Sequence, residues 1–214
     1  LVTLLGPGGI GKTRLALQVA QRLLPANGTG ETKSSAAATP FPDGIWLVER
    51  ATVADPHGVQ QMVAAVLAVR EESSLSLLQS IIEALRNKAA LLILDNCEHL
   101  LDACANLADT LLRACPAVKI LTTGRELLGV IGETVLRVPS LSLPNGVELA
   151  SPASLIEYDA VRLFVERAAA VRPEFVLNES NAAAIVHICR QLDGVPLAIE
   201  LAAARVRAMT PDQI

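Results

Sequence analysis

The amino-acid sequence predicts an α/β fold, in which a three-layer α/β/α domain with a mainly parallel sheet is followed by a small all-helical domain. Hydrophobic residues make up 51% of the 214 residues and aromatic residues only 2%. The core must therefore be aliphatic, which suits helices packed on a parallel sheet. Short apolar runs alternate with helical patterns up to residue 138, and only helical patterns follow. We expect domains at 1–143 and 155–214, a linker at 144–154, and a second domain truncated at its C-terminal side.

The first element is an apolar run at residues 1–5, which predicts a buried strand, and a helical pattern covers residues 14–24. Between them, Gly-Pro-Gly-Gly-Ile-Gly-Lys-Thr at 6–13 matches G-x-x-x-x-G-K-[ST], the Walker A or P-loop motif. Glycines let backbone N–H groups approach phosphate oxygens, and the N-terminus of a helix adds partial positive charge. We expect a nucleotide to be bound by this loop and its flanks: Gly6, Gly8, Gly9, Ile10, Gly11, Lys12, Thr13 and Arg14. In such loops the lysine reaches the β- and γ-phosphates and the threonine hydroxyl ligates Mg²⁺.

The next elements connect this motif to the centre of the sheet. Residues 25–42 are rich in Gly, Ser, Thr and Ala and predict a flexible loop. An apolar run at 45–48 predicts the second strand. Helices are expected from Pro56 through Val69, and from an N-cap at Ser74 to about Asn87.

The unbroken apolar run 89–94 ends in Asp95. This pattern predicts a central parallel strand with a carboxylate at its C-terminal edge, where open α/β sheets bind ligands. It is the Walker B pattern, so we expect Asp95, together with Thr13, to hold Mg²⁺. An ordinary strand-end aspartate is the alternative, and the nearby P-loop motif argues against it.

Asn96 and Glu98, which follow Asp95 in the sequence, are candidates for orienting an attacking water. Asn96 can hydrogen-bond water but is a poor base. Glu98 can act in its place, or it can be an acidic residue favoured by the dipole at a helix N-terminus. A helix is expected from Glu98 to Ala114.

A further strand is predicted at 118–123, with Gly124 and Arg125 at its end, and another at 135–138. Arginine pairs with phosphate through a bidentate fork, so Arg125 suits a γ-phosphate sensor that distinguishes ATP from ADP. A surface arginine capping the next turn is the alternative. The candidate catalytic residues are thus Lys12, Asp95 and Arg125, with Glu98 and Asn96 as weaker candidates.

After a proline-rich segment at 139–152, helical patterns run to the end of the chain, broken by Gly194-Val195-Pro196-Leu197. A helix–helix turn explains this break fully, because glycine ends helices and proline begins them.

The four cysteines show no C-x-x-C spacing, which favours buried, reduced thiols over a metal site or a disulfide. The net charge of −4 argues against nucleic-acid binding by this segment, and no apolar run is long enough to span a membrane. We expect a cytoplasmic location.

Five segments together resemble the STAND class of P-loop NTPases (signal-transduction ATPases with numerous domains, NB-ARC-like). The matching segments, in family order, are 4–16, 43–46, 92–100, 122–126 and 192–205. The chain is most similar to the nucleotide-binding region of large bacterial LuxR-type or AfsR-like transcriptional regulators and cyclase-linked ATPases. It departs from the family in a long loop at 25–42, and in Thr-Thr-Gly-Arg where Thr-Ser-Arg is commoner.

The resemblance implies contacts and partners that the residue patterns alone do not. Pro196 would touch the adenine or ribose, and Arg125 would sense the γ-phosphate. Winged-helix, sensor-repeat and output domains would lie outside this chain. The ADP form would be closed and autoinhibited, and the ATP form would be open and homo-oligomeric.

The sequence therefore favours an ATP/ADP-binding regulatory switch with slow ATP hydrolysis, coupled to domain opening and to control of an output domain, with transcription as the expected output. The alternative is a fast ATP-driven machine or a phosphotransferase. The absence of a Leu-Ser-Gly-Gly-Gln transporter signature and of an evident acceptor-substrate site weakens that alternative, as does Asn96 directly after the Walker B aspartate. A nucleotide-independent scaffold is a third hypothesis, against which the intact Lys12, Thr13 and Asp95 argue.

Overall fold

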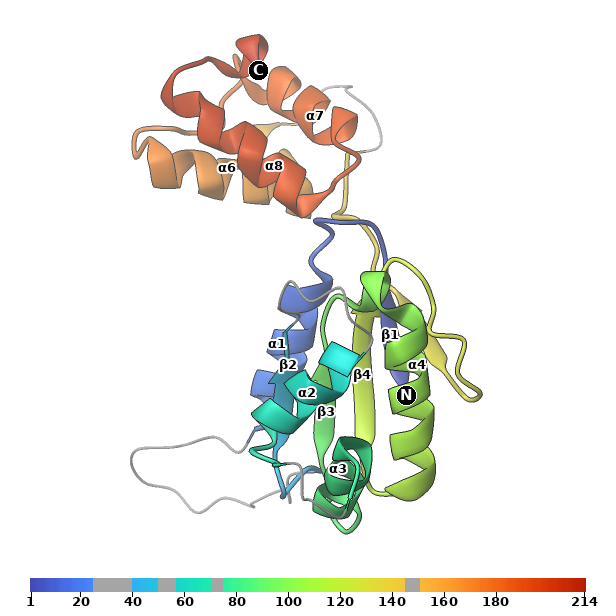
Figure 1. Ribbon diagram of the computed structural model, residues 1–214. Helices are drawn as coiled ribbons and strands as arrows, with labels where there is room; N and C mark the ends of the chain where they lie inside the picture. Colours follow the sequence, from blue (N-terminus) through green and yellow to red (C-terminus); the bar gives the residue numbers. More distant parts are fainter. Residues whose placement is uncertain (25–39, 50–56, 71–74, 145–150) are drawn as a thin grey trace, which may run out of the picture. The chain divides into compact units, whose positions relative to one another are not determined.

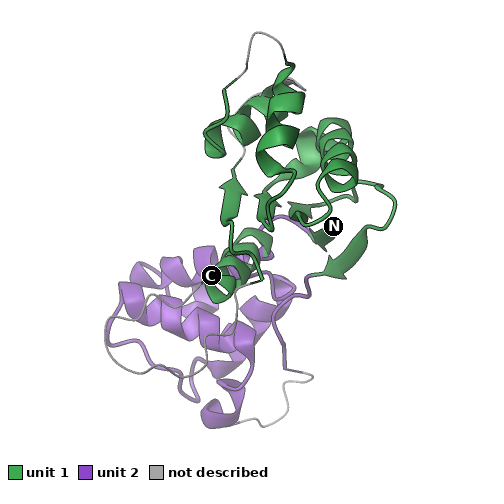
Figure 2. Ribbon diagram, turned by 90° about the horizontal axis from the view of Figure 1, so that it is seen from below, with its two compact units in different colours: residues 1–6, 12–137 green, residues 7–11, 138–214 purple. Residues whose placement is uncertain are grey.

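A computed structural model describes residues 1–24, 40–49, 57–70, 75–144 and 151–214. These residues form two compact units (Figure 2), the first comprising residues 1–6 and 12–137 and the second residues 7–11 and 138–214. The predicted loop at 25–42 and the predicted linker at 144–154 lie largely outside the described residues, so the linker bounds stay a prediction. The two units are described separately below.

The first unit is built on a five-stranded sheet in which every neighbouring pair of strands is parallel (Figure 1). The spatial order is β2 (Ile45–Val48), β3 (Leu91–Leu94), β4 (Lys119–Gly124), β1 (Val2–Leu5), β5 (Thr134–Arg137). This confirms the predicted fold class, and each predicted strand lies within two residues of its observed bounds. Because the strands are parallel, their carboxyl ends meet at one edge of the sheet.

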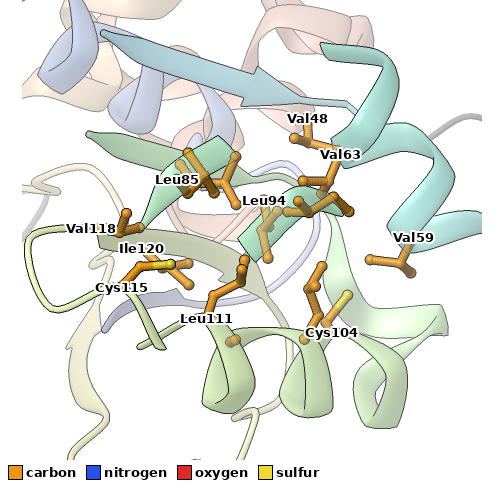
Figure 3. Close-up of a cluster of buried hydrophobic side chains, with 14 of the residues drawn as sticks. Val48, Val59, Val63, Leu85, Leu94, Cys104, Leu111, Cys115, Val118 and Ile120 are labelled. Atoms are coloured by element: carbon orange, nitrogen blue, oxygen red, sulfur yellow. The ribbon is translucent and has the colours of Figure 1, made fainter. Parts of the chain in front are cut away.

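Helices cover both faces of this sheet. α2 (His57–Val66), α3 (Leu77–Leu85) and α4 (Leu101–Ala114) pack on one face, where their side chains form an aliphatic core with alternate residues of β3 and β4 (Figure 3). α1 (Lys12–Leu23) packs on β1 and β4. It lies on the opposite face, because its Thr13 bonds to Asp95, and Asp95 alternates with the core residues Leu92 and Leu94.

The predicted bounds of α2, α3 and α4 were wrong. α2 ends at Val66 instead of Val69, because Ala68 adopts a left-handed conformation (φ 54°) and the Val69 N–H bonds back to the Ala64 carbonyl at 2.8 Å. Its predicted first residue, Pro56, lies outside the described residues. The predicted helix from Glu98 begins instead as a 3₁₀ turn, η1 (Cys97–His99), and α4 starts at Leu101.

The N-cap of α3 is Ser76 and not Ser74, and the helix ends at Leu85 instead of Asn87. The Ser76 hydroxyl accepts the Gln79 N–H at 3.3 Å, and the Gln79 side chain accepts the Ser76 N–H at 2.9 Å. This reciprocal capping box satisfies two backbone donors that a helix leaves free at its start.

The four cysteines are buried free thiols, as predicted. Burial raises the pKa of Cys189 to about 12, which keeps this thiol protonated at neutral pH. Within the described residues, no cluster of three or more His, Cys, Asp or Glu side chains could hold a metal ion. None of the described helices has the length and apolar character needed to cross a bilayer.

The second unit is helical in its 138–214 segment. It contains α5 (Pro152–Leu155), α6 (Asp159–Val171), α7 (Ala182–Gln191), α8 (Pro196–Ala203), η2 (Ala204–Arg207) and η3 (Pro211–Gln213). Phe164 of α6, Ile185 of α7 and Ile199 of α8 are fully buried in its core. α6, α7 and α8 all contribute buried side chains to this core, and the helical prediction for this part of the chain is confirmed.

The turn between α7 and α8 depends on two consecutive left-handed residues, Asp193 (φ 51°) and Gly194 (φ 67°). The Gly194 N–H bonds to the Cys189 carbonyl at 3.1 Å, and the Gly194 carbonyl accepts the Leu141 N–H at 3.0 Å. A Cβ at Gly194 would lie 2.6 Å from the Leu141 carbonyl oxygen. Glycine is therefore required both by the backbone conformation and by the close approach of the 138–144 segment.

We expect Gly194→Ala to lower the free energy of unfolding of the helical unit by about 2–4 kcal/mol, from left-handed strain plus the backbone clash. Denaturant unfolding followed by circular dichroism measures the change. Asp193→Gly is the matched control at the preceding position and should be neutral to stabilising by up to about 1 kcal/mol, because it relieves similar strain without adding a contact. A Gly194→Ala variant as stable as the parent chain would contradict this reasoning.

Candidate functional site

The glycine loop turns sharply between β1 and α1. Gly9 (φ 77°) and Gly11 (φ 100°) adopt left-handed conformations that other residues rarely accept, and the Ile10 N–H bonds to the Pro7 carbonyl at 3.4 Å. A Cβ at Gly11 would meet nothing within 4 Å. Two glycines of the predicted motif are thus required by the backbone, and the side of the loop at Gly11 is open.

Lys12 begins α1, and its Nζ donates to the Gly6 carbonyl at 2.8 Å. Burial lowers the pKa of the Lys12 ammonium, and the nearby Glu98 carboxylate is the largest opposing influence. Charges on Arg125 and Asp95 also act on Lys12, the first lowering and the second raising its pKa. Four charged residues predicted for the site therefore lie close enough to interact.

Asp95 is held by two hydroxyl groups that come from different elements. Thr13 Oγ1, in the first turn of α1, donates to the carboxylate and lies 2.8 Å from Oδ1 and 3.0 Å from Oδ2. Thr123 Oγ1, near the end of β4, donates to Oδ1 at 2.5 Å. The predicted Walker A threonine and Walker B aspartate therefore meet directly, although 82 positions separate them in the sequence.

The backbone around Asp95 fixes where its carboxylate projects. The Asp95 N–H continues the β2–β3 pairing by bonding to the Val48 carbonyl at 3.1 Å. Asn96 then turns the chain in a left-handed conformation (φ 59°, ψ 53°), and its N–H donates to Thr123 Oγ1 at 2.9 Å. The Asn96 residue is exposed. The regular pairing of β3 with β2 thus ends at Asp95, and the Asp95 side chain lies at the carboxyl edge of the sheet.

Glu98 and Arg125, which the sequence suggested for two separate roles, form an ion pair. Arg125 Nε lies 3.0 Å from Glu98 Oε2, and the side chains are 61% and 14% exposed, respectively. His99 Nε2 lies 3.8 Å from the other oxygen of Glu98. Arg125 is thus largely open to solvent while its partner is mostly covered, so Arg125 can exchange this carboxylate for another anion.

Pro196 occupies the first position of α8, and its neighbour Leu197 contacts the glycine loop within the second unit. The Leu197 N–H donates to the Gly9 carbonyl at 3.2 Å, and a Cβ at Gly9 would lie 2.8 Å from Leu197 Cβ. The Gly-Val-Pro-Leu turn and the apex of the loop, Pro7–Gly11, therefore touch. Residue patterns alone place this turn only between two helices.

Thr123 is the residue that the sequence prediction missed. The sequence places it only at the end of the strand predicted at 118–123, yet it bonds to both Asp95 and Asn96. A signal was available, because a polar residue at the end of an apolar strand next to the Walker B strand falls at the same edge. The observed register pairs Leu94 with Thr122, which puts Thr123 beside Asp95.

The oxygen donors of this site suit a small, hard cation bound together with a phosphate. Mg²⁺ is bound in proteins by one or two carboxylates while substrate phosphates and water complete its shell. The Thr13 hydroxyl and Asp95 carboxylate supply such a donor set at 2.8 Å from each other, and the Lys12 ammonium lies nearby. The residues therefore fit the predicted Mg²⁺ and nucleotide.

No protein-family model matches the chain. Over all 214 residues it is 42% identical to an uncharacterized protein of Mycobacterium tuberculosis and spans 48% of that protein. It is also 42% identical over 214 residues to a Mycobacterium tuberculosis protein provisionally named an HTH-type transcriptional regulator, of which it spans 21%. The chain is homologous to a segment of each of these proteins.

This homology bears out the resemblance to large bacterial regulators. The homologous segment makes up less than half of either relative. Among solved structures, a signal-transduction ATPase with numerous domains and a tetratricopeptide repeat sensor from Pyrococcus horikoshii aligns with 92% of the chain and 26% of that structure, with a TM-score of 0.47 and 17% identity.

Proposed function

We propose that this chain is an ATP/ADP-binding regulatory switch of the STAND type, with slow ATP hydrolysis. The observation that carries the proposal is the hydrogen bond between Thr13 and Asp95, at 2.8 Å. It joins the start of the helix after the glycine loop to the carboxyl end of β3, where a P-loop NTPase would bind the metal ion of its nucleotide.

The proposed binding roles follow from the chemistry of each group. Backbone N–H groups of Gly8, Gly9, Ile10 and Gly11 would face phosphate oxygens, with Gly6 and Arg14 flanking them. The Lys12 ammonium would bind the β- and γ-phosphates as a point charge. Thr13 and Asp95 would hold Mg²⁺, which supplies charge neutralisation at the phosphates.

Slow hydrolysis is supported by the state of the candidate bases. Asn96 is exposed and carries an amide, which cannot accept a proton from water at neutral pH. Glu98 is a carboxylate, but Arg125 holds it at 3.0 Å. The pair occupies Glu98 only until Arg125 turns to a γ-phosphate, so the expectation of slow turnover rests on the amide of Asn96 at the position directly after Asp95.

The same pair supports discrimination between ATP and ADP. For Arg125 to bind a γ-phosphate, it must give up Glu98, and a phosphate that accepts the guanidinium fork can compensate for that loss. ADP offers no such group. A ligand shifts a conformational equilibrium only through its different affinity for the two states, and this exchange would supply the difference.

Coupling to the helical unit is supported by the contact between the loop apex and the turn that contains Pro196. The Leu197 N–H already bonds to the Gly9 carbonyl, at 3.2 Å. In the proposed switch, Pro196 would touch the base or ribose, so that nucleotide and helical unit respond to each other. ATP-dependent opening and homo-oligomerisation would follow from this coupling.

The output of the switch is proposed from the relatives. One relative carries the provisional name of an HTH-type transcriptional regulator and is almost five times as long as the homologous segment. We infer that winged-helix, sensor-repeat and output domains act together with this segment, and that transcription is the process controlled. A cytoplasmic location follows from that role.

A fast ATP-driven machine or a phosphotransferase is the alternative function. It shares the Thr13–Asp95 geometry, so nucleotide binding alone does not separate the two hypotheses. The amide of Asn96 directly after Asp95, where a strong base would be expected in a fast ATPase, favours the switch.

We expect Lys12→Ala to weaken binding of MgADP and MgATP by at least about 100-fold, because a partly buried cation that bonds to phosphate is worth about 3 kcal/mol. Isothermal titration calorimetry measures the affinity, and circular dichroism checks the fold. Lys119→Ala is the control, since Lys119 is exposed at the opposite end of β4 and should leave affinity unchanged. Parental affinity in a folded Lys12→Ala chain would refute the P-loop assignment.

We expect Arg125→Ala to narrow the preference between ATP and ADP by about tenfold, because one charge-assisted contact to the γ-phosphate is lost. Glu98→Gln should move the preference toward ATP, because it leaves Arg125 charged but removes its ion-pair partner. Dissociation constants for ADP and a non-hydrolysable ATP analogue, measured on each variant, give the ratio. A ratio that Arg125→Ala leaves untouched would eliminate the sensor role.

A further inference from the structure

The Thr123 hydroxyl lies between Asp95 and Asn96 and bonds to both. It donates to Asp95 Oδ1 at 2.5 Å and accepts the Asn96 backbone N–H at 2.9 Å. The Thr123 residue is 1% exposed, so solvent does not supply a substitute for either bond. Its proton and one of its lone pairs are therefore both committed within the protein.

These bonds restrict the Asp95 carboxylate. The side chain of an aspartate has two torsions, and the second is broad and poorly defined by sterics alone. Here Thr13 and Thr123 approach the same carboxylate from α1 and from β4, so both torsions are constrained. Donors that bond to a metal-ligating carboxylate orient it, and their removal typically lowers metal affinity.

We propose that Thr123 is a positioning residue that sets the Mg²⁺ affinity of the site through Asp95. The inference rests on the proposed function, which assigns Mg²⁺ to Asp95 and Thr13. Thr123 does not ligate the metal in this proposal, since its hydroxyl donates to the ligand. Its influence is on the orientation of Oδ1 and, through the Asn96 N–H, on the turn that follows Asp95.

The neighbouring Thr122 provides a matched control. It lies in the same strand, is fully buried, and its hydroxyl bonds to Thr3 Oγ1 at 2.7 Å. Because adjacent residues of a strand point to opposite faces, this hydroxyl lies on the side away from Asp95. Removing it deletes a buried hydroxyl of the same kind without touching the proposed metal ligand.

The test compares Thr123→Val, Thr123→Ser and Thr122→Val with the parent protein. Calorimetry measures ADP affinity in Mg²⁺ and again in EDTA, and the ratio of the two gives the gain due to the metal. We expect Thr123→Val to reduce this ratio about tenfold, while Thr123→Ser and Thr122→Val keep the parental ratio. Affinity in EDTA should be the same in all four proteins, and Thr123→Ala repeats the test if circular dichroism shows that the valine variant is unfolded.

An unchanged ratio in Thr123→Val or Thr123→Ala would overturn the inference, as would an equal fall in Thr122→Val. Failure of the proposed function gives a different result. If the parent protein binds ADP in neither buffer, the proposal that it binds a nucleotide is contradicted. If it binds ADP equally in Mg²⁺ and EDTA, the proposed metal site is contradicted, and the proposed role of Thr123 loses its basis.

Discussion

The contact on which the site depends is the pair of hydrogen bonds from Thr13 to the Asp95 carboxylate, at 2.8 and 3.0 Å. They join the first turn of α1 to the end of β3, two elements that share no backbone pairing. β1 and β3 are not neighbours in the sheet, because β4 lies between them. The Thr13 hydroxyl at the start of α1 therefore reaches past β4 to the end of β3. Thr123, at the end of β4, donates a further hydrogen bond to the same carboxylate.

Parallel strands explain why such separate residues meet. The sheet places the carboxyl ends of β1, β3 and β4 at one edge, and each of these ends carries a polar or glycine-rich turn. Lys12, Asp95, Glu98 and Arg125 follow three different strands, yet their charges interact at that edge. Burial disfavours the charged form of Lys12, and the carboxylates of Glu98 and Asp95 offset part of that cost. The charged form of Lys12 therefore depends on the charges of its three neighbours.

Much of the fold and part of the site could be predicted from the sequence. The apolar stretches of the sequence located the strands of the sheet, although Lys119 and Arg137 interrupt those of β4 and β5, and the glycine loop identified the start of α1. Helix ends were less predictable. α2 stops early through a left-handed Ala68, and α3 begins at Ser76 because Gln79 completes its capping box. Several neighbouring residues could each begin or end a helix, and tertiary packing decides which of them does.

The site contacts that were missed all depend on register or on long-range approach. The contact of Thr123 with Asp95 follows from the register of β3 and β4, and Glu98 pairs with Arg125 from within the 3₁₀ turn Cys97–His99. The contact between Leu197 and Gly9 joins residues far apart in the chain, and no local pattern encodes it. Local sequence motifs therefore identified the functional groups, and the topology of the sheet determined which of them lie in contact.

The most direct test of the switch is the identity of the nucleotide that the purified protein carries and the rate at which it hydrolyses ATP. The protein is denatured, the released nucleotide is identified by chromatography, and single-turnover hydrolysis of bound ATP is then followed over time. Tightly held ADP and a turnover slower than about one per minute, far below the ~10 s⁻¹ of ordinary enzymes, are the predicted results. An empty site with rapid multiple turnover would contradict the switch and favour the ATP-driven machine, and failure to bind either nucleotide would contradict the assignment of the site itself.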